Sequence, residues 1–390
     1  PPEAPELPMT TTTARIARIL GIAMASATVA VSSFVAAPGA YAAGDITEYP
    51  LPTPASIPVA ITSGTDGNLW FVNRGIGGIG RITTDGVVTQ FALASGSRPE
   101  AIALGPDGSL WFTEPTFDRI GRITRAGVIT LFVLPAGSAP DGIVVGPDGK
   151  LWFTESGRNM IGRITTAGAL AHFLLPTLGA YPRGITVGSD GNLWFTMVAA
   201  NAIGRITLGG GITVFPIARG SGPTRITSGA DGNLWFTEFN GDRIGSMTTS
   251  GALTEFALPA GSSPLWITTG PGRDLWFTEP GSDSIASISM RGVVTQYPVP
   301  TDGSDPAGIT TGPDGNIWFT ESAGNAIGTL SMSGVISGSS GSDEGQWVQA
   351  YERANARQVC ERGWTRSWNQ WPNNGAGGYV CTRSVVAYGP

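Results

Sequence analysis

The sequence predicts an all-β fold, a seven-bladed β-propeller built from four-stranded blades. A phrase close to Pro-x-Gly-Ile-Thr-x-Gly-Pro-Asp-Gly-Asn-Leu-Trp-Phe-Thr-Glu occurs seven times, and its successive copies lie 41 or 42 residues apart. A period near forty, with strand and turn patterns but no helical periodicity, is typical of a radial array of small sheets. The tryptophans that mark the period are Trp70, Trp111, Trp152, Trp194, Trp235, Trp276 and Trp318.

Each repeat contains the pattern of four short strands. In the second repeat, the apolar residues 101–104 precede a Gly-Pro-Asp-Gly turn, and the aromatic β-formers of 110–113 follow it. Residues 120–124 alternate between apolar and polar, and residues 128–134 form a fourth apolar run that ends at a proline. We therefore expect one antiparallel sheet per repeat. We expect the repeated tryptophans to pack between neighbouring sheets, because a large aromatic side chain buries about 150–250 Å².

The fourth strand is missing from the last repeat, where residues 335–340 are mostly glycine and serine. A segment of the same pattern, residues 46–52, precedes the first repeat. We expect this N-terminal strand to complete the seventh blade, because a closed ring leaves no unpaired sheet edge at its seam. The propeller is then predicted to occupy residues 43–338.

The N-terminal segment, residues 1–42, is predicted to be an extension followed by a secretory signal peptide. Arg15 and Arg18 precede an apolar stretch, and Ala40-Tyr41-Ala42 offers a cleavage site. An uncleaved membrane anchor is the alternative. Either reading predicts an exported protein that is secreted or held at the cell surface.

The C-terminal segment is predicted to be a separate small module. Residues 339–345 form a Gly/Ser linker, and residues 346–390 are rich in tryptophan and contain both cysteines. In an exported chain we expect Cys360 and Cys381 to form a disulfide. The tryptophans of this module would form a miniature core or an exposed face that attaches to a wall, a glycan or a protein.

Composition restricts the class of partner. The formal net charge is −6, and the few Lys and Arg residues are scattered through the repeats. A chain without a basic stripe is not expected to bind nucleic acid. We expect a monomer whose partner is a small molecule or a cell-envelope component at one mouth of the central channel.

Candidate site residues lie at the ends of the first hairpin of each repeat. The first residue of the inner strand and the last residue of the next strand should face each other at the channel mouth. Five of the seven second members are Glu, which would either serve a structural role at strand ends or contribute to a site. The sector with the most charge contains Glu100, Glu114, Asp141, Glu155 and Arg183. Four carboxylates gathered there would suit a hard cation such as Mg²⁺ or Ca²⁺.

Histidine chemistry is scarce in this chain. Its single histidine, His172, lies in a predicted outer strand, and we expect it at the surface or at an edge. The sequence therefore excludes a Ser-His-Asp arrangement and a His/Cys zinc cluster, and it leaves no histidine at the mouth to act as a general base.

The phrases Gly142-Ile143 to Glu155, Ile161-Gly162-Arg163-Ile164-Thr165 and Leu253-Thr254-Glu255-Phe256-Ala257-Leu258-Pro259 resemble the virginiamycin B lyase (streptogramin B lyase) family. The resemblance covers all seven repeats and implies a seven-bladed propeller. The family's enzymes use Mg²⁺ to linearise a cyclic depsipeptide antibiotic by elimination at an ester. Their base is a histidine in the phrase Pro-His-Gly/Ala-Ile.

Carried over by position, the family's histidines fall at Leu265 and Ala307, neither of which can take a proton. Acidic neighbours persist in part, and with the charged sector they give the candidate metal ligands Glu100, Asp141, Glu279, Asp305 and Glu321. Three functions remain open. The first is a secreted propeller that binds a ligand or a surface partner. The second is a lyase or lactonase-like hydrolase with a carboxylate base, and the third is a structural envelope protein.

Overall fold

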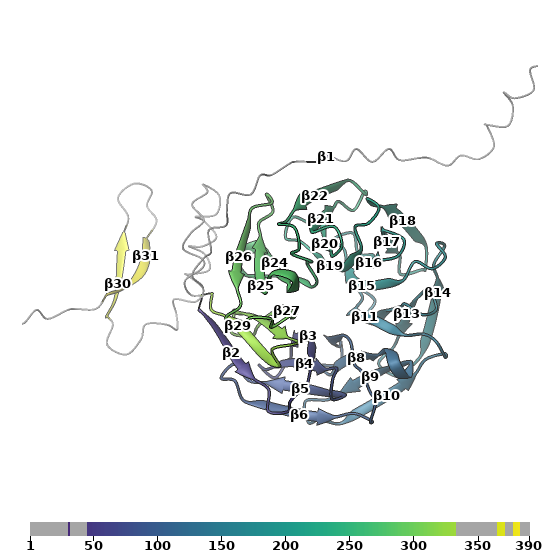
Figure 1. Ribbon diagram of the computed structural model, residues 1–390, viewed down its shortest axis with the longest axis horizontal. Helices are drawn as coiled ribbons and strands as arrows, with labels where there is room; N and C mark the ends of the chain where they lie inside the picture. Colours follow the sequence, from purple (N-terminus) through teal and green to yellow (C-terminus); the bar gives the residue numbers. More distant parts are fainter. Residues whose placement is uncertain (1–29, 32–44, 333–364, 371–376, 383–390) are drawn as a thin grey trace, which may run out of the picture.

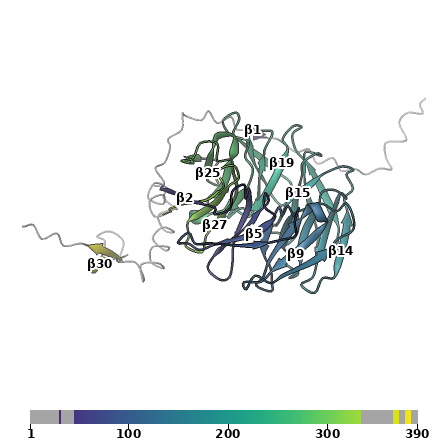
Figure 2. The ribbon, with the colours of Figure 1, turned by 60° about the horizontal axis from the view of Figure 1, so that its bottom comes forward.

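The computed structural model describes residues 30–31, 45–332, 365–370 and 377–382. Residues 45–332 form a ring of seven antiparallel four-stranded blades around a central channel (Figure 1). Figure 2 shows the same ring tilted, with the blades standing side by side around it. The predicted fold class is confirmed.

The strands of each blade follow the chain outward from the channel. From blade 1 to blade 7, the inner strands are β3 (Pro58–Ser63), β7 (Ile102–Leu104), β11 (Pro140–Val145), β15 (Pro182–Val187), β19 (Pro223–Ser228), β23 (Ile267–Thr269) and β27 (Pro306–Thr311). The second strands are β4 (Leu69–Asn73), β8 (Leu110–Glu114), β12 (Leu151–Glu155), β16 (Leu193–Met197), β20 (Leu234–Glu238), β24 (Leu275–Glu279) and β28 (Ile317–Glu321).

The third strands are β5 (Gly78–Ile82), β9 (Arg119–Ile123), β13 (Met160–Ile164), β17 (Ala202–Ile206), β21 (Arg243–Met247), β25 (Ser284–Ile288) and β29 (Ala326–Leu330). The outer strands of blades 1 to 6 are β6 (Val88–Ala92), β10 (Ile129–Val133), β14 (Leu170–Leu174), β18 (Ile212–Pro216), β22 (Leu253–Ala257) and β26 (Val294–Pro298). Outside the ring, β1 (Ala30–Val31) pairs in parallel with β22, and β30 (Thr365–Gln370) pairs with β31 (Gly377–Thr382).

The N-terminal strand closes the ring, as predicted. β2 (Ile46–Pro50) pairs antiparallel with β29, from Ile46 opposite Leu330 to Pro50 opposite Ala326. In Figure 1 the purple strand β2 lies beside the yellow-green strand β29. The seventh blade therefore combines the two ends of the repeat array, so that no sheet edge is open at the seam.

Several predictions about the ends fall outside what the structure describes. The predicted linker 339–345 and Cys360 lie outside the described residues, and so does most of the predicted leader 1–42. Within the described residues, no helix has the length and apolar character needed to cross a membrane.

The repeated tryptophan forms the core between blades, as predicted. All seven indoles are at most 1% exposed. Trp111 shares a core cluster with Phe153 of blade 3, and its ring stacks on Phe132 of its own outer strand with centroids 5.2 Å apart. Its Nε1 donates to the carboxylate of Asp107 in the preceding turn at 3.0 Å. The Asp of each Asp-Gly turn therefore satisfies a buried donor as well as shaping the turn.

Blade 6 departs from this arrangement. Its turn reads Pro-Gly-Arg-Asp, so that Gly272 stands where the other blades have Asp, and the buried Nε1 of Trp276 has no hydrogen-bond partner. Arg273 takes the place of the turn glycine and has a φ of 76°, in the left-handed region. Both features cost stability, because an unpaired buried donor and a left-handed non-glycine residue are each unfavourable.

Restoring the turn should stabilise the protein. Gly272 also has a left-handed φ, of 74°, so the double variant Gly272→Asp/Arg273→Gly must adopt the turn of the other blades, in which only the glycine is left-handed. With that turn we expect a gain of about 1–3 kcal/mol in free energy of unfolding, from one buried hydrogen bond and one relieved backbone conformation. Chemical denaturation followed by intrinsic fluorescence measures this gain. The matched variant Asp107→Ala removes the same bond from blade 2 and should lose stability. An unchanged or lower stability of the blade 6 double variant would contradict this account.

Candidate functional site

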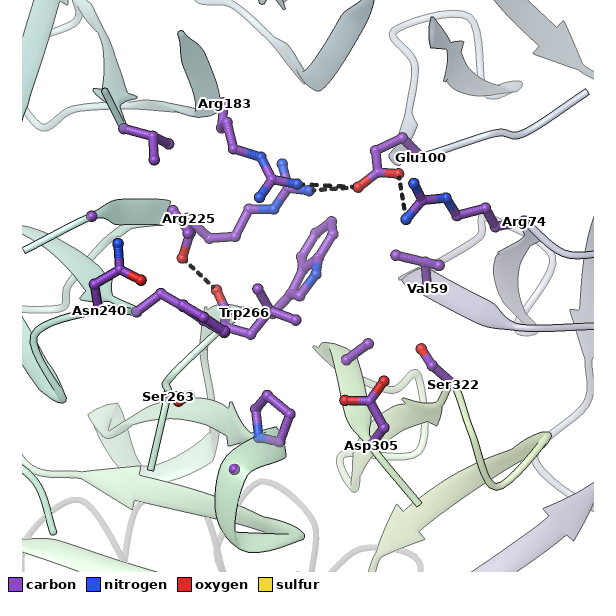
Figure 3. A pocket seen from close by; sticks show the side chains of 18 of the residues that line it. Val59, Arg74, Glu100, Arg183, Arg225, Asn240, Ser263, Trp266, Asp305 and Ser322 are labelled. Atoms are coloured by element: carbon purple, nitrogen blue, oxygen red, sulfur yellow. Dashed lines mark hydrogen bonds and ion pairs between the residues drawn. The ribbon is translucent and has the colours of Figure 1, made fainter. Parts of the chain in front are cut away.

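A pocket of about 630 Å³ opens at one mouth of the central channel. It is bounded by the first residues of the inner strands and by the loops that join second to third strands (Figure 3). Such a volume lies within the usual range of small-molecule sites, about 300–1,000 Å³. The predicted site therefore coincides in position with a cavity, although only some of the predicted residues line it.

The first hairpin of most blades contains a β-bulge at the mouth. In blade 3, Pro140 pairs with Glu155 and Ile143 with Phe153, so that the inner strand carries one extra residue between them. The predicted pairing of Asp141 with Glu155 is therefore wrong by one residue. The bulge separates the two predicted sets of side chains. Most first members line the pocket, whereas the repeated glutamates lie inside the blades.

Glu114 and Glu155 are consequently not part of the pocket. Both are fully buried between the strands of their own blades. Glu114 Oε1 accepts from Arg119 Nη2 at 3.3 Å, and its Oε2 forms an ion pair with Arg119 Nε at 3.0 Å. Glu155 lies 2.5 Å from His172 Nδ1, so that the single histidine faces into blade 3 from its outer strand and its side chain is only 23% exposed. The repeated glutamate has a structural environment, with side chains of the third and outer strands as its partners.

The other repeated glutamates have less favourable partners. Glu279 accepts from Gln296 Nε2 at 2.6 Å, and burial raises its pKa. Burial raises the pKa of Glu238 to about 7, and the neighbouring carboxyl of Glu255 adds to the increase. Burial also raises the pKa of Glu321 to about 8, with Glu48 of the closing strand contributing. Blade 5 thus buries two carboxyl groups, whereas in blade 7 the buried Glu321 is near Glu48, which is partly exposed and accepts hydrogen bonds from Thr301.

Glu100, Asp141 and Arg183 do come together, as the sequence indicated, and Arg225 joins them. Arg183 Nε lies 2.9 Å from Asp141 Oδ2, and Arg225 Nη1 lies 2.5 Å from Asp141 Oδ1. Glu100 Oε1 lies 3.3 Å from Arg183 Nη2 and 3.5 Å from Arg225 Nη2. Arg74 approaches Glu100 Oε2 at 3.6 Å. We refer to these five residues, which come from blades 1 to 5, as the arginine–carboxylate cluster; Figure 3 labels its members other than Asp141.

The electrostatics of the cluster favour its charged form. Burial alone would raise the pKa of Asp141, but attraction to Arg225 and Arg183 outweighs it and holds the pKa at about 2. Attraction to Asp141 likewise raises the pKa of Arg183. With three guanidinium groups against two carboxylates, the cluster has one positive charge in excess.

Arg225 and Trp266 were not singled out from the sequence. Each follows the first member of its inner strand, a position that is Gly or Ala in the other five blades. At this position the inner strand of the next blade passes very close, and a Cβ on Gly184 would lie 2.8 Å from Arg225 Cα. The interruption of the Pro-x-Gly-Ile phrase by a large residue in two neighbouring blades could have revealed them.

Arg225 and Trp266 fill the centre of the channel. The guanidinium carbon of Arg225 lies 4.1 Å from the centroid of the Trp266 indole. Trp266 starts from blade 6 and packs against the cores between blades 1 and 2, blades 2 and 3, and blades 6 and 7. This cation–π pair spans the channel and forms one side of the pocket.

The five predicted metal ligands are not assembled into a cation site. Glu100 and Asp141 are neutralised by arginines, and Glu279 and Glu321 are buried in separate blades. Asp305 lines the pocket. Burial raises its pKa, and the negative charge of the nearby Asp283 adds to the increase. Across the described residues, no group of three or more His, Cys, Asp or Glu side chains could hold a metal ion. The donor set present at the mouth therefore does not fit Mg²⁺ or Ca²⁺.

Comparison with known proteins identifies the family. The family model described as the virginiamycin B lyase family matches residues 39–103, 94–260 and 216–347. This chain belongs to the virginiamycin B lyase family. No curated protein matches the chain in a sequence search.

Two solved structures are similar at the level of sequence. A catalytically inactive histidine-to-alanine variant of virginiamycin B lyase from Staphylococcus aureus with quinupristin is 42% identical, covering 74% of this chain and 99% of that chain with a TM-score of 0.71. A streptogramin B lyase is 36% identical over 74% of this chain and 97% of its own, with the same TM-score. Kuenenia stuttgartiensis hydrazine synthase, at 18% identity and a TM-score of 0.60, shares the fold alone.

Proposed function

We propose that this family member binds a small ligand at the channel mouth and lacks the histidine-dependent ring-opening chemistry of the lyases. The pocket supports binding, because a cavity of about 630 Å³ is bordered by charged groups, an indole and apolar side chains. The observation that carries the proposal is that Leu265 and Ala307, the positions to which the family resemblance assigns histidines, both line the pocket and cannot accept a proton.

The similar structures give this observation its weight. The solved Staphylococcus aureus lyase variant is described as catalytically inactive, and it differs from the enzyme by a histidine-to-alanine change. The family resemblance places one of the family's histidines in the phrase Asp305-Pro306-Ala307-Gly308-Ile309, where this chain has alanine. The single histidine, His172, is held by Glu155 inside blade 3 and cannot replace the missing base. We further propose that the protein acts as a monomer, secreted or at the cell surface, with its C-terminal module as an attachment site.

A direct assay tests the loss of ring opening. We expect quinupristin, incubated with the folded protein and Mg²⁺, to remain cyclic. Elimination leaves the mass unchanged, so the measurement is a chromatographic shift combined with fragmentation of the product. An active streptogramin B lyase run in parallel provides the positive control. Linear product that disappears with EDTA would overturn the proposal.

Asp305 supports a second candidate function. It lines the pocket beside Ala307, and its raised pKa would suit a carboxylate that accepts a proton. A lyase or lactonase-like hydrolase could use it as a base in place of histidine. This candidate predicts turnover that is abolished by Asp305→Asn while the fold is retained.

A further inference from the structure

We propose that the ligand of the channel-mouth pocket is a small aromatic carboxylic acid, whose ring stacks on Trp266 and whose carboxylate pairs with Arg74. This inference rests on the proposed binding function and specifies its ligand class. It follows from three features of the pocket: a fixed indole, an accessible guanidinium group and an apolar wall.

The indole of Trp266 is a fixed platform. Arg225 covers it at 4.1 Å, and Arg225 is itself only 4% exposed and held by Asp141 and Glu100. Trp266 is also wedged against the cores of blades on both sides of the channel. The indole nevertheless remains half-buried and lines the pocket (Figure 3). An aromatic ring held in place in this way favours stacking with a planar ligand, because little side-chain entropy is lost on binding.

Arg74 is the arginine best placed to bind an anion. It lies on the loop after β4, and its side chain is 47% exposed, against 24% for Arg183 and 5% for Arg225. Its contact with Glu100 is 3.6 Å, longer than the 2.7–2.9 Å of a strong charge-assisted hydrogen bond. The guanidinium group can therefore bind a second carboxylate and donate two parallel hydrogen bonds to it.

The charge around the pocket favours an anion over a cation. The carboxylates of Glu100 and Asp141 are already paired with arginines. The arginine–carboxylate cluster has one positive charge in excess. Asp305 lines another part of the pocket. A ligand carboxylate placed beside the exposed Arg74 would thus be attracted by the guanidinium groups of the cluster, whereas an ammonium group placed there would be repelled by them.

Part of the remaining wall is apolar and suits an uncharged ring. This part includes Ile57 and Val59 of blade 1, Leu265 of blade 6 and Ala307 of blade 7, while polar residues line other parts of the pocket, among them Thr224, Asn240, Ser263 and Ser322. This wall and Trp266 enclose the apolar part of the pocket, and Arg74 lies at its edge. A ligand with a planar apolar body and one anionic end matches this division.

Four related probes separate the contributions. We expect phenylacetate to bind the full chain in isothermal titration calorimetry. Phenylacetamide lacks the charge, cyclohexylacetate lacks the aromatic ring, and phenethylamine carries the opposite charge, so each should bind at least about tenfold more weakly, a change of about 1.4 kcal/mol. Phenylacetamide or phenethylamine binding as tightly as phenylacetate would overturn the inference, as would the absence of phenylacetate binding.

Variants locate the binding site. Arg74→Gln should weaken phenylacetate about tenfold and leave phenylacetamide unchanged, while Trp266→Phe should retain binding and Trp266→Leu should lose it. Arg122→Gln is the matched control, because Arg122 is a partly exposed arginine that pairs with Asp107 in the turn of blade 2, away from the pocket. Equal loss in Arg122→Gln and Arg74→Gln would refute the site.

The outcomes also separate this inference from the proposed function. Suppose that phenylacetate fails to bind, that intact quinupristin does bind, and that quinupristin binding is lost in Trp266→Leu. The proposed ligand class is then wrong and the proposed binding function stands. If quinupristin is opened, the proposed function fails whatever the probes show.

Discussion

Replacing Asp141 by alanine should destabilise the propeller by about 3–5 kcal/mol, because it leaves the buried guanidinium group of Arg225 and the partly exposed one of Arg183 without their main partner. Asp141 is 7% exposed and contacts both Arg183 and Arg225. Arg225 is the more buried of the two and would keep only the longer contact with Glu100 at 3.5 Å. Urea denaturation of the wild type and the variant at pH 7 measures the loss.

The exposed end of the same cluster provides the control. Arg74→Ala removes a contact of 3.6 Å made by a side chain that is 47% exposed, and such pairs contribute at most about 1 kcal/mol. The difference in stability loss between Asp141→Ala and Arg74→Ala separates the effect of burying charges from the effect of placing them close together. Adding Arg225→Met to Asp141→Ala should recover part of the stability, because the most buried unpaired charge is then gone. If Asp141→Ala and Arg74→Ala were equally mild, the cluster would not be a buried ion network.

The fold was predictable because its determinants are local and repeated. The Asp-Gly turn, the buried indole and the apolar strands recur at a fixed period, and their repetition makes each assignment support the next. Closure by β2 was predictable for the same reason, since the pattern missing from the last repeat is present before the first. The position of the pocket followed from the fold, because all inner strands begin at the same mouth.

The composition of the pocket was less predictable, because it depends on register. One extra residue in the inner strand, at Asp141 or its counterparts, turns the repeated glutamates away from the channel. A spacing of 14 residues in the sequence contains no sign of that bulge. The roles of Arg225 and Trp266 depend on contacts across the channel between blades far apart in sequence. Only their departure from Gly or Ala could have drawn attention to them.

The protein should be more stable at pH 5 than at pH 8, owing to the buried glutamates Glu238 of blade 5 and Glu321 of blade 7, each of which lies near a second carboxyl group. The pKa of Glu321 is raised from 4.5 to about 8 and that of Glu238 to about 7. Each group therefore holds a proton in the folded state that it releases on unfolding. The contribution of each group to the free energy of unfolding is complete below pH 4.5 and is lost as the pH rises through its pKa in the folded state. Each can reduce stability by up to about 1.4 kcal/mol per pH unit in that window.

The arrangement around the third-strand glycines explains these shifts. Gly328 lies opposite Glu48 of the closing strand, and Gly245 lies opposite Glu255. A Cβ on Gly245 would lie 2.9 Å from Glu238 Oε1, so the absence of a side chain there leaves room for the carboxyl of Glu238. One proton between the two carboxyl groups of a pair would allow one to donate to the other. The nearby Ser221 hydroxyl and attraction to Arg243 lower the pKa of Glu238 and offset part of the increase, whereas burial and Glu48 both raise the pKa of Glu321.

Substitution of Glu321 by glutamine tests whether this residue causes the pH dependence of stability. Glu321→Gln is neutral and can donate to Glu48 at every pH, so it should raise stability at pH 8, leave it nearly unchanged at pH 5 and flatten the pH profile between them. The same change in blade 2, Glu114→Gln, removes the charge that pairs with Arg119 and should be destabilising at both pH values. Thermal unfolding across this range measures both variants. Parallel profiles for the wild type and Glu321→Gln would mean that Glu321 is ionised in the folded protein and that the pair with Glu48 does not share a proton.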